Sequence, residues 1–202
     1  MASPLLFRKK DLGIESEHAM TIKAQSGRCA PAWRPSGGFS LIELLIVVAI
    51  ILIIAAIAIP NLLRAQMAAH ESSAVGSVRT IVTSQVTYQS TWGVGFANGL
   101  TILGTPAAGC AGATAAISCL IDPALTTGLK SGYNINTAAA GGAGTASSPN
   151  TTFGVDAWPI TPGSTGTRAF CSDETGVIHY NTGGTQIGET DALCEAVTAV
   201  LQ

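Results

Sequence analysis

An unbroken apolar segment near the start of the chain constrains its structure more than any other feature. Residues 41–59 read LIELLIVVAIILIIAAIAI, and eighteen of these nineteen side chains are apolar, the exception being Glu43. As a helix the segment is roughly 28 Å long at about 1.5 Å per residue, close to the thickness of the hydrocarbon core of a bilayer. The run is too long for a β-strand, and a helix that is apolar on every side must face lipid or be enclosed by protein. The sequence therefore predicts a membrane helix.

Two ordinary interpretations of this helix leave observations unexplained. A cleavable secretory signal has a shorter apolar core of about 7–15 residues that ends before a cleavage site. This segment instead continues into Pro60-Asn61 and a further helical pattern. A plain single-pass anchor fits the length and the basic residues before it, which the positive-inside rule places in the cytoplasm. It does not explain Glu43, because a carboxylate at the centre of a lipid-facing helix costs about 2.5–3.5 kcal/mol, and less near the interface.

Charge divides the chain into a basic leader and an acidic remainder. Residues 1–38 hold six of the ten Lys and Arg residues and three acidic residues, whereas residues 39–202 hold four basic and nine acidic residues. Because this remainder has no basic surface for phosphates, we expect no nucleic-acid binding. Three histidines are too few for a histidine-based metal cage, and the sequence contains no G-x-S-x-G elbow, P-loop or H-E-x-x-H motif. We therefore expect no enzyme, no cofactor and no bound metal.

The residues at the start of the apolar segment carry a specific resemblance. The stretch GGFSLIELL at positions 37–45 resembles the processing and assembly motif of type IV prepilins, and the likeness extends to about residue 65. The resemblance implies that a membrane aspartyl peptidase cuts after Gly38 on the cytoplasmic side and N-methylates the new terminus at Phe39. Gly38 suits such a cut because its missing side chain lets the backbone enter a narrow site. Pro60 also matches a proline that interrupts the apolar helix in this family.

The resemblance also implies a partner for Glu43. In the family the equivalent carboxylate pairs with the N-terminal amine of a neighbouring subunit, which here belongs to Phe39 after cleavage. Inside a bundle of apolar helices an unmatched charge would cost several kcal/mol, so the pair favours one stagger of the subunits over others. Residues 1–38 then form a basic leader that is removed. Met20 is an alternative start that leaves a leader of 19 residues without acids.

The helix is expected to continue beyond the membrane. We interpret residues 39–60 as the transmembrane and fibre-core helix, and residues 61–93 as its amphipathic continuation, because apolar residues recur there at three- and four-residue steps. Pro60 removes one backbone donor and should kink or locally melt the helix. Gly93 and Gly95 should end it, which gives a rod of about fifty residues and roughly 80 Å.

Residues 94–202 are predicted to form a small globular head. The chain from 93 to about 130 reads as loop, and four later stretches read as short strands: 132–137, 152–158, 168–171 and 176–180. The resemblance implies an antiparallel sheet packed on the second half of the helix, an α+β fold of the type IV pilin kind. The spacer 138–150 should be an exposed, mobile loop.

Three polar residues of the rod and head could have either a structural or a functional role. Asn150 begins the triplet Asn-Thr-Thr, which matches a glycosylation sequon, although such triplets are common by chance. His70 is expected on the solvent-facing side of the long helix, and His179 in a strand has no evident Ser or Cys partner. We expect both histidines to be structural.

Cysteine usage indicates disulfides in the head. Cys29 is lost with the leader, which leaves four cysteines: Cys110, Cys119, Cys171 and Cys194. Disulfides are the default in an exported head, whereas the rival zinc site lacks a C-x-x-C pair and a histidine at ligand spacing. Four cysteines allow three connectivities, and the sequence alone does not select one. We favour Cys110–Cys119 and Cys171–Cys194, and the second resembles the C-terminal disulfide loop of many pilins.

The resemblance implies a structural subunit of a type IV pilus. The precursor would be a single-pass protein of the bacterial inner membrane. After processing, it would polymerise with copies of itself through the N-terminal helices, aided by the inner-membrane assembly machinery, into an extracellular fibre with roles such as adhesion or twitching motility. A type II secretion pseudopilin and a minor pilin are alternatives of the same class. A single-pass, membrane-anchored binding domain is the alternative from a different class, and it leaves Gly38-Phe39 and Glu43 unexplained.

Overall fold

One long helix organises the molecule. The structure is a computed structural model, and it describes residues 38–106 and 109–201, so nearly all of the predicted leader lies outside the described residues. Helix α1 (Leu41–Trp92) has 52 residues and ends at Gly93, whose N–H donates to the Gln89 carbonyl at 3.0 Å. Gly93 has a φ of 64°, a left-handed conformation that glycine adopts without strain, so it ends α1 as predicted.

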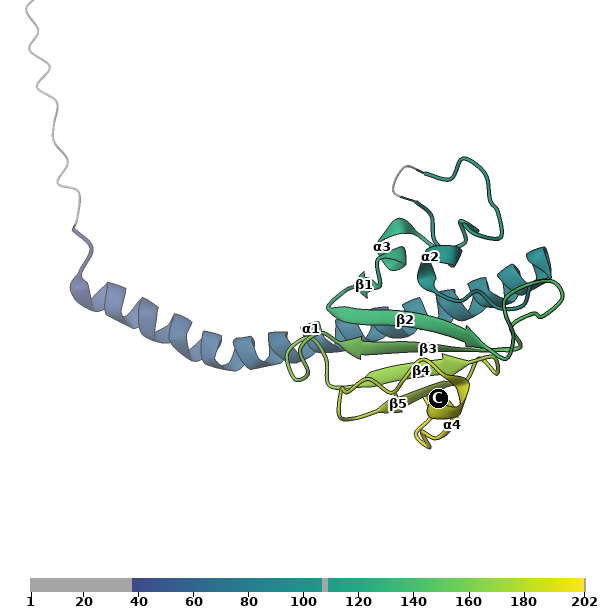
Figure 1. Ribbon diagram of the computed structural model, residues 1–202. Coiled ribbons are helices and arrows are strands. Elements are labelled where there is room, and N and C mark those ends of the chain that lie inside the picture. Colours follow the sequence, from purple (N-terminus) through teal and green to yellow (C-terminus); the bar gives the residue numbers. More distant parts are fainter. Residues whose placement is uncertain (1–37, 107–108, 202) are drawn as a thin grey trace, which may run out of the picture.

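Pro60 lies inside α1 without interrupting it. The helix continues through Pro60 and Asn61, so the predicted local melting is wrong. Proline removes one backbone donor, but the turns on either side keep their own hydrogen bonds and hold the helix together. Figure 1 shows α1 as one curved rod whose N-terminal half projects from the head.

The head contains a five-stranded antiparallel sheet with its strands in the order β1-β2-β3-β4-β5. The strands are β1 (Leu129–Lys130), β2 (Tyr133–Ala140), β3 (Thr152–Pro159), β4 (Ala169–Asp173) and β5 (Ile178–Asn181). Four of them were predicted. The two-residue β1 was not, because it is too short to show an alternating pattern.

The spacer at residues 138–150 is only partly a loop, which corrects the prediction. Its first three alanines continue β2, with Ala138 opposite Gly154 and Ala140 opposite Thr152. Small side chains carry little strand signal, yet the ladder is built from backbone groups and does not need large ones. Asn150 at the other end of the spacer is also buried.

The segment between α1 and the sheet folds over the core instead of forming a plain loop. It contains the one-turn helices α2 (Leu100–Leu103) and α3 (Pro123–Thr126). The Asp122 carboxylate caps α3 by accepting a hydrogen bond from the Leu125 N–H at 2.7 Å, and Pro123 follows it at the first helical position. Single turns are too short for a helical period, so the prediction missed them.

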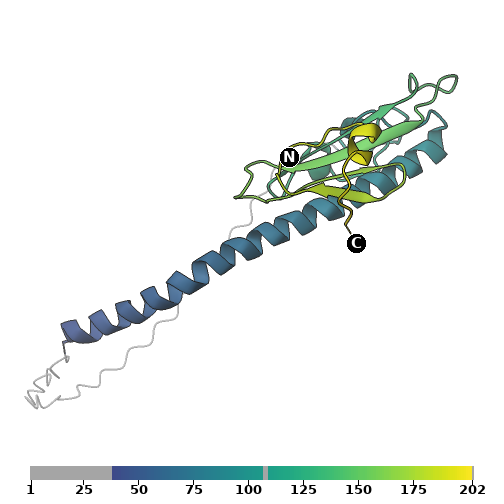
Figure 2. The same ribbon diagram turned by 90° about the horizontal axis from the view of Figure 1, so that it is seen from below.

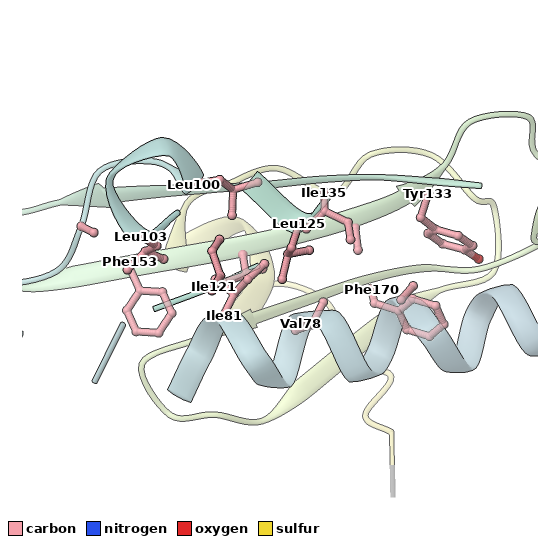
Figure 3. Close-up of a cluster of buried hydrophobic side chains, with 14 of the residues drawn as sticks. Val78, Ile81, Leu100, Leu103, Ile121, Leu125, Tyr133, Ile135, Phe153 and Phe170 are labelled. Carbon is pink, nitrogen blue, oxygen red and sulfur yellow. The ribbon is translucent and has the colours of Figure 1, made fainter. Parts of the chain in front are cut away.

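The two faces of the sheet have different covers. Helix α1 packs on one face, and the C-terminal segment with α4 (Asp191–Glu195) lies on the other (Figures 1 and 2). Figure 3 shows the core between α1 and the sheet. Its buried side chains come from α1, from the sheet and from the segment that connects them. They are Val78 and Ile81 of α1, Tyr133, Ile135, Phe153 and Phe170 of the sheet, and Leu100, Leu103, Ile121 and Leu125 of the connecting segment.

Candidate processing and assembly site

The predicted cleavage bond lies in open chain just before α1. Gly38, Phe39 and Ser40 are neither helical nor in a strand, and all three are exposed. Apart from its chain neighbours, no described residue has an atom within 4 Å of the position that a Cβ on Gly38 would occupy, and the Phe39 side chain is 77% exposed. The backbone on both sides of the Gly38–Phe39 bond is therefore accessible to an enzyme. Cleavage there and methylation of Phe39 stay predictions.

Glu43 lies in the first turn of α1 and is bound by the beginning of its own helix. Its Oε2 accepts a hydrogen bond from the Ser40 N–H at 2.9 Å. This bond satisfies one of the four N–H groups that a helix leaves free at its N-terminus, and the helix dipole favours a negative charge at this position. Because Phe39 directly precedes Ser40, an amine formed on Phe39 by cleavage would lie at the same end of the helix. A carboxylate can accept further bonds, so Glu43 can also accept a donor from outside the chain.

The apolar half of α1 surrounds this carboxylate with side chains that no other described part of the chain covers. The large apolar side chains between Leu41 and Leu63 are 46–79% exposed. By length and composition, α1 is a helix that can cross a membrane, and its most apolar stretch buries nothing against the head. The beginning of α1 therefore combines one charged group with a surface that water does not solvate favourably.

The second half of α1 carries another acid, Glu71, which the sequence interpretation did not single out. It is only 6% exposed. Its Oε1 accepts hydrogen bonds from the Thr167 N–H, the Thr167 hydroxyl and the Arg168 N–H, at 2.9, 2.9 and 3.2 Å. Its Oε2 accepts two more from the Arg168 guanidinium, at 2.8 and 2.7 Å. Burial works to raise the pKa of Glu71, but the hydrogen bonds from Thr167 and Arg168 outweigh it and lower that pKa.

Glu71 lies at the centre of a group of contacts that joins α1 to the head, and we call this group the collar. It consists of His70, Glu71 and Ser73 of α1 with Ser131, Thr165, Thr167 and Arg168 of the head. His70 contacts the Thr165 carbonyl through Nδ1 at 3.1 Å, and the Ser73 hydroxyl donates to the Ser131 hydroxyl at 2.9 Å. The prediction that His70 faces solvent is therefore wrong, since it lies half-buried at the edge of the head. A signal for the collar was present in the sequence, because Glu71 falls on the same helical stripe as the apolar positions three and seven residues later.

Arg168 is held on its other side by aromatic rings. Its guanidinium carbon lies 5.6 Å from the centre of the Phe170 ring and 5.5 Å from that of Tyr180. These cation–π contacts and the two-pronged bond to Glu71 fix the position of the side chain. The collar therefore sets where the head sits along α1.

Two disulfides stabilise the head. Cys110 pairs with Cys119 and Cys171 with Cys194, so the favoured connectivity is confirmed. The second disulfide links β4 to α4 across 23 residues of sequence and holds the C-terminal segment against the sheet. In the chain-entropy view, such a link stabilises a fold by about 3 kcal/mol.

The remaining candidate groups are engaged in structure. The Asn150 side chain is buried and donates to the Phe96 carbonyl at 2.8 Å, so the sequon does not lie in an exposed loop. His179 contacts the Val197 carbonyl through Nδ1, which agrees with a structural role. Among residues 38–106 and 109–201, no group of three or more His, Cys, Asp or Glu residues is arranged to hold a metal ion.

Comparison with known proteins places the similarity in the N-terminal part of the chain. Residues 33–59 match the family model of the prokaryotic N-terminal methylation motif. The chain is 49% identical over 53 residues to the type IV major pilin protein PilA of Myxococcus xanthus, a match that covers 26% of this chain and 24% of that relative. It is 48% identical over 56 residues to the type IV wide pilus major component PilA4 of Thermus thermophilus, which covers 28% of this chain and 43% of that relative. No solved structure matches the chain significantly.

The similarity and the fold point to the same kind of protein. The matched segment spans less than half the length of either relative. The family model covers the residues around Gly38 and the apolar segment 41–59. The head contributes an antiparallel sheet packed on the second half of a long helix. Both relatives are named as major components of pili, which are structural assemblies and not enzymes. In its methylation motif, its apolar helix and its α+β architecture, this chain resembles the type IV pilins.

Proposed function

We propose that this chain is a structural subunit of a type IV pilus. Its precursor spans the bacterial inner membrane once, is cleaved after Gly38 and N-methylated at Phe39, and then polymerises through its N-terminal helices into a surface fibre. The observation that carries this proposal is an uncovered apolar half-helix that begins with a carboxylate, Glu43, in its first turn.

The apolar half of α1 needs two environments in turn. In the precursor, lipid covers the side chains between Leu41 and Leu63, which the head leaves exposed. In a fibre, the same side chains pack against helices of other subunits. Apolar contacts with lipid and with protein are similar in kind, so exchanging one for the other does not fix how the helices are staggered.

Glu43 supplies the stagger that apolar packing lacks. In a dry bundle of helices, a carboxylate and an amine attract each other strongly only when they lie close together, and each is unfavourable when alone. The Phe39 amine of one subunit beside Glu43 of the next satisfies both charges at one relative position. Because the collar holds each head at a set place on its helix, the stagger of the helices also determines how the heads are spaced on the surface of the fibre.

The proposal is tested by comparing Glu43→Ala with Glu174→Ala, a matched control at an exposed acid in the turn after β4. Fibres are sheared from cells that express each variant, and the intact mass of their subunits is measured with and without reduction. We expect wild type and Glu174→Ala to yield fibres whose subunit begins at methylated Phe39 and gains about four mass units on reduction of its two disulfides. We expect Glu43→Ala to be processed but largely missing from fibres.

Other outcomes identify the alternatives. Wild-type amounts of fibre from Glu43→Ala would overturn the proposed role of the charge pair. A processed chain that stays in the inner membrane in wild-type cells points to a pseudopilin. An uncut chain that keeps its leader points to a plain membrane anchor.

A further inference from the structure

A short C-terminal segment crosses the face of the sheet that α1 does not cover. We call residues 186–190 the strap. The Gly188 N–H donates to Oδ2 of Asp156 in β3 at 2.9 Å, and the Asn136 side chain in β2 donates to the Glu189 carboxylate at 2.6 Å. A Cβ on Gly154 would lie 2.4 Å from the Glu189 carbonyl oxygen, so the strap rests directly on the backbone of β3. Two polar side chains of the sheet thus hold the strap.

Asp156 is an unusual group for this position. It is fully buried, and its Oδ1 has no hydrogen-bond partner among the described residues, whereas Oδ2 is bonded to the strap. Burial raises the pKa of Asp156 to about 6 although backbone N–H groups of the strap oppose the rise, and the nearby charge of Glu189 adds to it. A buried carboxylate with a free oxygen is unfavourable when ionised, and a proton on that oxygen removes the charge.

Among the described residues, the surroundings of Asp156 offer no compensating cation. From the strap it meets Glu189, and from β2 the neutral Asn136, which is its partner in register. From β4 its partner in register is Cys171, which is bonded to Cys194 of α4, and Asp173 lies two residues further along β4. His179 of β5 is the partner of Cys171 in register, and its Nδ1 is engaged by the Val197 carbonyl. Glu195 of α4 is exposed and does not contribute to the shifted pKa of Asp156, and neither ion pair of the described residues includes Asp156 or Glu189.

We propose that Asp156 is the proton-binding group of a latch: the strap closes over β2 and β3 when Asp156 is protonated and loosens when Asp156 loses the proton. The proton resides on Oδ1, the oxygen without a partner, while Oδ2 continues to accept from Gly188. The Cys171–Cys194 disulfide stays intact throughout, so α4 remains tied to β4 and the strap opens as a loop. The proposal concerns the single chain and holds whether or not the chain polymerises.

The direction of the pH dependence follows from the raised pKa. Asp156 binds the proton more tightly when the strap is closed than when it is open, because in the open strap its pKa returns to the ordinary value of about 3.8. The ratio of closed to open strap is therefore highest below about pH 4. It falls about tenfold per pH unit as the pH rises and becomes constant above about pH 6. Between pH 4.5 and pH 7.5, the ratio of closed to open strap should fall about twentyfold to thirtyfold.

Amide hydrogen exchange of the full chain in detergent micelles tests the latch. Protection of the peptide that contains Gly188 is measured between pH 4.5 and pH 7.5 with the disulfides intact, after correction for the intrinsic pH dependence of exchange. In wild type we expect protection to fall about twentyfold to thirtyfold over this range. Asp156→Asn keeps an oxygen acceptor for Gly188 but does not titrate, so its protection should stay high and flat.

Two further variants sharpen the test. Glu189→Gln removes the neighbouring negative charge, so the transition should move to lower pH. Glu195→Gln, a matched change at an exposed acid of α4, should follow wild type. Flat protection in wild type, or the wild-type slope in Asp156→Asn, would overturn the proposal. Restoration of protection at pH 7.5 by calcium chloride, and its loss on adding EDTA, would also overturn it, because a cation and not a proton would then hold the strap.

Discussion

The two halves of α1 form one continuous helix, yet they use the same residue types for opposite purposes. In the first half, Ile51 is 57% exposed and, among the described residues, Glu43 is bonded only to the beginning of its own helix. In the second half, Ile81 is fully buried and Glu71 accepts five hydrogen bonds from the head. The second half is covered by the head, whereas the apolar side chains of the first half stay exposed among the described residues. Glu71 thus stabilises the folded head, whereas Glu43 keeps acceptor capacity for the assembly role that we propose for it.

The largest effect is expected from breaking the collar. Glu71→Ala should lower the free energy of unfolding of the head by about 3–5 kcal/mol, because the Arg168 guanidinium and two backbone N–H groups lose their acceptor. Glu43→Ala should leave that free energy unchanged, since Glu43 does not contact the head. Urea unfolding of the detergent-solubilised chain, followed by near-UV circular dichroism, measures both. An equal loss in the two variants would contradict the division of α1 into a folding half and an assembly half.

A smaller effect is expected from a pair of isoleucines. Ile81→Ala removes three carbons from the core between α1 and the sheet and should destabilise the head by about 3 kcal/mol. Ile51→Ala, the matched change in the apolar half, should alter head stability by less than about 0.5 kcal/mol. The same urea titration measures both. A large loss in Ile51→Ala would mean that the apolar half supports the head after all.

The pH dependence of the collar gives a smaller, graded effect. The folded pKa of Glu71 lies below its ordinary value of 4.5, so the stability that the carboxylate contributes is present above pH 4.5 and is lost as the pH falls through the folded pKa. Glu71→Gln should be less stable than wild type at pH 7, and the difference should shrink below pH 4.5. Unfolding free energies at pH 3, 4, 5 and 7 test this convergence. A difference that stays constant with pH would show that the charge of Glu71 does not matter.

The smallest effect on the head is expected at the border between the halves. Pro60→Ala restores one backbone donor in α1 and should slow hydrogen exchange of the amides around residue 60, because proline is the least favourable residue inside a helix. Head stability should not change, since Pro60 is exposed and lies outside the core. Mass spectrometry of exchanged peptides, together with the urea titration, separates the two effects. Altered head stability would couple the halves through the helix itself.

Much of the fold could be predicted from the sequence because its signals are long or alternating. The apolar helix extends over nineteen residues, and the strand interpretation at residues 152–158 agrees with β3 to within one residue. The N-terminal motif also predicted Gly38 just before the helix and Glu43 in its first turn, where the structure has them. What remained hidden depends on residues far apart in the chain. Glu71 and Arg168 are separated by 97 residues, so the sequence around one of them does not indicate that the other is its partner.

Local chemistry misled the prediction in two other places. The run of small residues at 138–150 carries no apolar pattern, yet its first part pairs with β3 through backbone groups alone. The residues before Asn150 have a composition typical of a loop. Its backbone and side chain nevertheless bond to Val94 and Phe96, which holds it below the surface. Burial of a polar residue by a segment distant in sequence leaves no trace in its immediate neighbours.

The end of the chain also bears on how such molecules can meet one another. The Tyr180 N–H donates to the Ala199 carbonyl at 2.9 Å and the Leu201 N–H to the Ile178 carbonyl at 2.8 Å, so the last residues run along the free side of β5. An uncovered strand edge is a template on which other chains can add strands without limit. Here the tail already occupies that template. Heads crowded together at high local concentration are thereby steered away from pairing sheet to sheet, which is compatible with the assembly through the helix that we propose.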